Sequence, residues 1–68
     1  MEPAEERLRR QAAGRYRSED GRFRVESSDG AWYVTDQETR DELGQAKLSG
    51  PYPTLEEATR AVAAARAG

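Results

Sequence analysis

Two Asp-Gly dipeptides, Asp20-Gly21 and Asp29-Gly30, constrain the fold of this chain more than any other feature of its sequence. Each lies between short segments that are rich in aromatic and β-branched residues, which favour strands. Asp-Gly is the strongest short-range signal for a two-residue type I′ turn, because that turn needs a positive φ at both positions. The sequence therefore predicts two consecutive β-hairpins that share their middle strand.

Counting outward from the two turns gives the register of the three predicted strands. Tyr16 then lies opposite Val25, and Val25 lies opposite Val34. Side chains alternate between the two faces of a strand, so this register sorts the residues into two sets. The predicted core face carries Tyr16, Phe23, Val25, Trp32 and Val34, with Trp32 as the anchor of the core. The opposite face, called the outer face below, carries Arg15, Arg17, Arg22, Arg24, Glu26, Tyr33 and Thr35.

The segment after the hairpins has a weaker strand pattern. Residues Gln37–Asp41 are predicted as a polar loop and Glu42–Leu48 as a further strand. On hydrophobicity, Ala46 and Leu48 are expected to join the core, and Lys47 is expected to face out.

A helix is predicted at the C-terminal end of the chain. Thr54 followed by Glu57 forms a capping box, which predicts a helix from Leu55 to about Ala67. Its apolar stripe consists of Leu55, Ala58, Val62 and Ala65.

Residues 1–14 are predicted as a flexible or weakly helical tail, because good helix formers run from Ala4 to Ala13 before Gly14. Residues 15–68 then form the domain. Its expected class is α+β, with a small antiparallel meander of three to four strands and one C-terminal helix packed on one face.

The residue types argue against catalysis. The chain has 68 residues and contains no cysteine and no histidine, so it lacks the usual nucleophile, base and soft metal ligands. The acidic segment from Asp36 does not match a calcium loop, and the segment from Gly44 to Gly50 does not match a phosphate loop. We therefore expect no enzyme activity, no metal and no cofactor, and the sequence shows no sign of a small-molecule substrate. No apolar run approaches the roughly 20 residues of a membrane span, which predicts a cytoplasmic protein without membrane contact.

Charge is distributed unevenly along the chain although the net charge is only −2. Seven arginines lie within residues 7–24, and the predicted register sets Arg17 directly opposite Arg24. Like charges in that position are destabilising, so a sheet that keeps them has either nearby acids or an anionic partner. The candidate contacts for such a partner are Arg15, Arg17, Arg22, Arg24, Tyr33 and Lys47.

Besides plain solubility, the uneven distribution of charge suggests two functions. The first is a non-catalytic module that binds nucleic acid, with duplex DNA as the specific candidate. The alternative is a protein-interaction module that uses a sheet edge or the acidic residues Asp36, Glu38, Asp41 and Glu42.

Two stretches of the sequence carry a family resemblance. The run from Gly50 to Ala61 resembles the end of AP2/ERF DNA-binding domains, where a last strand, an aromatic residue and a Thr-capped helix follow in this order. Residues 21–26 are similar to a strand of the same family, whose sheet contacts DNA. The resemblance implies DNA contacts by Arg15, Arg17, Arg22 and Arg24. Through Trp32-Tyr33-Val34 and the capped helix, the chain also resembles small bacterial domains of unknown function.

Overall fold

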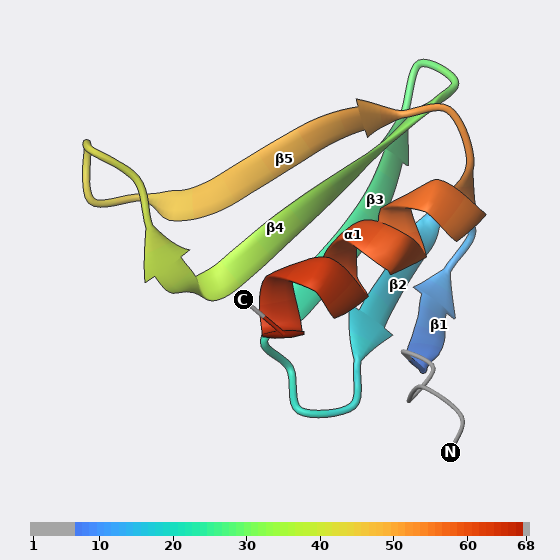
Figure 1. The fold of residues 1–68 in the computed structure, drawn as a ribbon. Helices are drawn as coiled ribbons and strands as arrows, with labels where there is room; N and C mark the ends of the chain where they lie inside the picture. Colours follow the sequence, from blue (N-terminus) through green and yellow to red (C-terminus); the bar gives the residue numbers. More distant parts are fainter. Residues whose placement is uncertain (1–6, 68) are drawn as a thin grey trace.

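A computed structural model shows a five-stranded antiparallel sheet with one helix packed against it (Figure 1). The structure describes residues 7–67. Each strand pairs with its neighbour in the chain, so the sheet is a simple meander in the order β1-β2-β3-β4-β5. This confirms the predicted α+β class, with five strands in place of three or four. The elements are β1 (Leu8–Ala12), β2 (Arg15–Ser18), β3 (Phe23–Ser28), β4 (Ala31–Arg40), β5 (Ala46–Tyr52) and α1 (Leu55–Ala67).

The register of the two central hairpins is the predicted one. Tyr16 pairs with Val25, and Val25 pairs with Val34. Asp29 and Gly30 both have a positive φ, of 52° and 80°, as a type I′ turn requires. The β3–β4 turn is therefore confirmed in both position and chemistry.

The β2–β3 connection keeps the predicted register but uses a different turn. Gly21 has a φ of 76°, whereas Asp20 has no positive φ, so the type I′ turn predicted here is wrong. The Asp20 carboxylate instead accepts hydrogen bonds at Oδ1 from Ser18 Oγ (2.7 Å) and from the Arg22 amide (3.1 Å). Asp side chains commonly satisfy turn amides in this way, which fixes the loop without a left-handed Asp.

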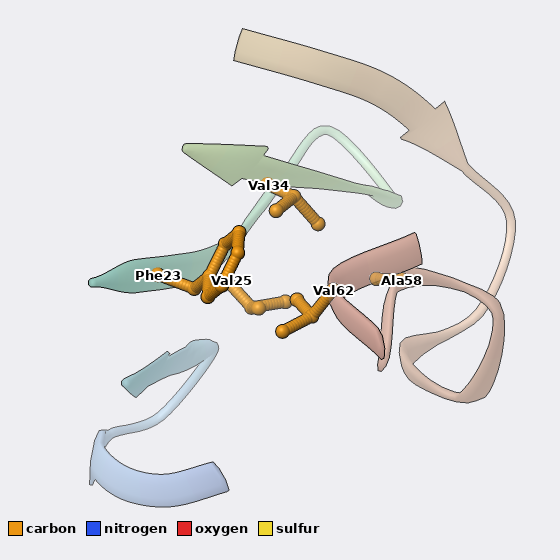
Figure 2. Packing of buried hydrophobic residues seen from close by; sticks show 5 residues of the cluster. All are labelled: Phe23, Val25, Val34, Ala58 and Val62. Carbon is orange, nitrogen blue, oxygen red and sulfur yellow. The ribbon is translucent and has the colours of Figure 1, made fainter. Parts of the chain in front are cut away.

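The core lies between the sheet and the helix. Figure 2 shows Phe23 and Val25 from β3, Val34 from β4, and Ala58 and Val62 from α1 meeting in one cluster, and all five are buried. Burial of these apolar side chains is the main stabilising contribution in a domain of this size.

Trp32 lies on the core face as predicted, but at the rim of the cluster rather than at its centre. It is half-buried, and its ring packs against Tyr16 with the ring centroids 5.9 Å apart. The buried aromatic at the centre is Phe23, which has no exposed surface.

The helix begins and ends where the sequence indicates. Thr54 Oγ1 accepts a hydrogen bond from the Glu57 amide at 3.1 Å, which caps the first turn. Of the predicted stripe, Ala58 and Val62 are buried and Leu55 is half-buried, whereas Ala65 is exposed. The sheet therefore covers the first three of the four stripe residues.

The predicted N-terminal tail is wrong for residues 8–12, which form strand β1. Leu8 pairs with Ser18 and packs against the core cluster, while Arg10 pairs with Tyr16. Pairing to a neighbouring strand outweighs the helix propensity of these residues. The rest of that prediction, over residues 1–6, lies outside the described residues.

The second half of the sheet also differs from the prediction. Residues 37–40 belong to β4 rather than to a loop, and β5 begins only at Ala46. Leu48 pairs with Thr35 on the outer face and is 62% exposed, whereas Lys47 pairs with Asp36 on the face that carries the helix. The two side chains are thus exchanged relative to the prediction.

The exchange has a cause in the register of β5. Between Trp32 and Val34 the chain of β4 advances by two residues, while their partners Tyr52 and Ser49 are three residues apart. An extra residue in one strand reverses the inward and outward positions on either side of it. Tyr52, which packs against the core, occupies the position on the helix-bearing face that hydrophobicity alone assigned to Leu48.

Candidate anion-binding face

Three arginines lie side by side across the outer face of the sheet. Arg9 on β1 pairs with Arg17 on β2, and Arg17 pairs with Arg24 on β3. Adjacent strands are about 4.8 Å apart, so the three side chains start within roughly 10 Å of one another. We call Arg9, Arg17 and Arg24 the arginine row.

The members of the row differ in their acidic neighbours. Arg9 lies 3.9 Å from a Glu19 carboxylate oxygen at an exposed position. Within residues 7–67, neither Arg17 nor Arg24 has a hydrogen bond or ion pair through its side chain, and both are exposed. These two directly opposed arginines therefore have no ion pair within the described residues.

The β2–β3 turn determines where the Arg17 side chain lies. A Cβ atom on Gly21 would be 3.2 Å from Arg17 Nη2, so the guanidinium group lies against the bare backbone of this glycine. Gly21 also has a left-handed φ that disfavours larger residues. The turn therefore holds the middle member of the row in place.

A shallow basin of about 200 Å³ opens beside the row. Arg15, Arg17 and Arg24 line it together with Glu26, whose carboxylate lies 3.5 Å from Arg15 Nε. Three cations around one carboxylate leave the basin with a positive balance, which suits an oxyanion such as phosphate.

Arg22 is not part of this face, although strand alternation predicts it there. Its Nε and Nη2 donate to the two Asp36 carboxylate oxygens at 3.0 and 3.1 Å. The Asp36 carboxylate also accepts from Thr39 Oγ1 and from the Glu38 amide. Asp36 is only 7% exposed. The hydrogen bonds to its carboxylate, above all those from Arg22, hold the pKa of Asp36 well below the usual range. The same pairing raises the pKa of Arg22.

The two remaining predicted contacts lie in different places. Tyr33 is on the outer face, half-buried beside Glu26, with its ring against Gly50. Lys47 is on the other face of the sheet and does not join the arginines. The structure thus gathers Arg15, Arg17, Arg24 and Tyr33 from the predicted set.

The sequence prediction missed Arg9. Residues 8–12 consist of good helix formers, and no turn dipeptide of the Asp-Gly kind precedes β2. The one local signal is Gly14, which has a φ of 72° in the β1–β2 turn, and a glycine in that place is equally typical of a helix end.

Two further kinds of feature are absent from the described residues. Residues 7–67 contain no group of three or more Asp or Glu side chains positioned to hold a metal ion. Over the same range, no helix has the length and apolar character that crossing a membrane requires.

Comparison with known proteins adds no assignment. No protein-family model matches this chain, and comparison with curated proteins and with solved structures gives no significant match.

Proposed function

We propose that this domain is a non-catalytic binding module whose outer sheet face binds duplex DNA through the phosphate backbone. The observation that carries the proposal is the direct opposition of Arg17 and Arg24 without any acidic partner in the described residues. Like charges in directly opposed strand positions cost stability, and a polyanion laid across them removes that cost.

Duplex DNA fits the layout of the face better than an isolated anion. It carries one negative charge per about 1.7 Å of helix axis, so the roughly 10 Å spanned by the arginine row faces several phosphates at once. Arg15 at the basin extends the positive region along β2. The AP2/ERF resemblance implies DNA contacts by Arg15, Arg17 and Arg24, which lie on this face. It also implies a contact by Arg22, which pairs with Asp36 instead.

The test is the salt dependence of duplex binding. Each phosphate contact contributes about 0.9 to the slope of log affinity against log salt. The double variant Arg17→Gln/Arg24→Gln should therefore lower that slope by nearly two, measured by fluorescence anisotropy with a labelled duplex at several salt concentrations.

A matched control removes two cations outside the outer face. Lys47→Gln/Arg60→Gln makes the same change in net charge, with Lys47 on the other face of the sheet and Arg60 on the exposed side of α1, paired with Glu56. If both double variants lower the slope equally, binding depends on net charge and not on the outer face. Absence of duplex binding by the native domain at low salt would rule the proposal out.

A second candidate function rests on β5. This strand is an edge of the sheet and carries exposed Leu48, and Leu43 in the adjoining β4–β5 loop is 81% exposed. An open edge with apolar side chains is typical of strand-addition sites in protein-interaction modules. Chemical-shift changes confined to β5 and the acidic β4–β5 hairpin on adding a protein partner, with the arginine row unaffected, would favour this function.

A further inference from the structure

The helix covers only part of the sheet face on which it packs. α1 contacts β3, β4 and β5. A helix with its side chains is about 10–12 Å wide, whereas five strands about 4.8 Å apart extend over roughly 19 Å. Figure 1 shows the β4–β5 hairpin projecting past α1. A groove of about 430 Å³ lies where this projecting part of the sheet meets the second half of the helix.

The groove is mostly apolar. Ala61, Ala64 and Ala65 line it from α1, and their short side chains leave its volume unfilled. At its floor it reaches Phe23 and Val34 of the core cluster. The apolar lining and the volume of a few hundred Å³ match those of sites for small organic ligands, and the groove is half open to solvent.

Two charged side chains, Asp36 and Lys47, line the groove, and only Asp36 has a partner of opposite charge. Four hydrogen bonds, two of them from Arg22, satisfy the carboxylate of Asp36. Lys47 pairs with Asp36 in the strand register, yet its ammonium group has no hydrogen bond or ion pair within residues 7–67. The uncompensated charge of the groove is therefore positive and belongs to Lys47.

We propose that this groove binds a small molecule with a short apolar chain and one carboxylate group. The apolar chain lies between the alanines of α1 and Tyr52 of β5, and the carboxylate pairs with the Lys47 ammonium group. An ion pair at the mouth of an apolar groove gives orientation, and the apolar contact gives most of the affinity. The site lies on the opposite side of the sheet from the arginine row and does not depend on the proposed function.

Sodium octanoate is a suitable probe, titrated into the labelled domain and followed by amide chemical shifts. We expect the largest shifts at Ser49, Ala61, Ala64 and Ala65. Lys47→Gln should weaken binding about threefold to tenfold, which is the range for one charged hydrogen bond that is partly exposed. The control Arg17→Gln, which removes a cation from the other face, should leave the affinity unchanged.

A second variant tests the apolar part of the groove. Ala64 is exposed, so Ala64→Leu keeps a good helix former and fills the groove without disturbing the core. It should abolish the octanoate shifts, whereas Ala67→Leu, outside the groove, should not. Equal binding of octanoate and 1-octanol, unchanged affinity in Lys47→Gln, or shifts located on the outer face would each overturn the proposal.

Discussion

Arg22 and Asp36 join the β2–β3 loop to the middle of β4 through two parallel hydrogen bonds of 3.0 and 3.1 Å. The pair lies beside the core, where the Arg22 guanidinium carbon is 4.7 Å from the centre of the Phe23 ring. Arg66 of α1 contacts the same ring at 5.1 Å and pairs with Asp20 at 2.6 Å. An arginine predicted as a ligand contact therefore stabilises the fold instead.

Asp36→Asn should destabilise the domain by about 1–3 kcal/mol, because it leaves Arg22 without its charged partner. Urea unfolding at neutral pH measures the change. Glu42→Gln, at an exposed position in the β4–β5 loop, removes one negative charge without such a partner and serves as the control. Equal stability of the two variants would show that the Arg22 pair contributes nothing.

The stability of the native domain should fall in acid. The pKa values of Asp20 and Asp36 are both lowered in the folded state, Asp20 mainly by Arg66 and Asp36 mainly by Arg22. Lowered values mean that the stabilisation is complete above the unfolded aspartate pKa of about 3.9 and is lost as the pH falls below it. Urea midpoints between about pH 6 and pH 2 should show this loss, and it should be smaller in Asp36→Asn.

The arginine row should cost stability in the free domain. Arg17→Gln/Arg24→Gln is expected to raise the free energy of unfolding by about 0.2–1 kcal/mol at low salt, because it removes two directly opposed like charges. High salt should reduce the gain, since it screens exposed charges. Arg15→Gln, which breaks the pair with Glu26, should give no gain. A double variant less stable than the native domain would mean that these arginines have structural contacts.

Phe23 and Trp32 should differ in their response to truncation. Phe23→Ala removes the fully buried ring at the centre of the cluster and should cost about 3–5 kcal/mol, enough to unfold so small a domain. Trp32→Ala should cost less, because the indole is half-buried at the rim. Near-ultraviolet circular dichroism and thermal unfolding compare the two, and an unfolded Trp32→Ala with a folded Phe23→Ala would contradict the packing described above.

The parts of the fold that were predictable from sequence are those with a short-range chemical cause. The Asp29-Gly30 turn fixes the β3–β4 register, and Thr54 fixes the start of α1. The outer position of Arg24 follows from the same register. That of Arg17 follows from the β2–β3 register, which the Asp20-Gly21 pair located although its turn type differs. These features need only turn and cap chemistry, which a few neighbouring residues determine.

The remaining parts depend on contacts between distant segments. Strand β1 exists because β2 offers it a free edge, and nothing within residues 8–12 indicates this. The face of Leu48 depends on one extra residue in β5, and the position of Arg22 depends on a carboxylate fourteen residues away. Local propensity and strand alternation carry no information about any of these three features.

The order of the elements along the chain has a consequence for biosynthesis. All five strands precede α1, and each pairs only with its chain neighbours, so the sheet has its hydrogen-bonding partners before the helix has been made. Until Ala58 and Val62 leave the ribosome, however, the side chains of Phe23, Val25 and Val34 remain exposed to solvent on the face that α1 later covers. A nascent chain stalled before Thr54 is therefore prone to chaperone capture and aggregation, and packing of α1 onto the sheet removes this exposed apolar surface.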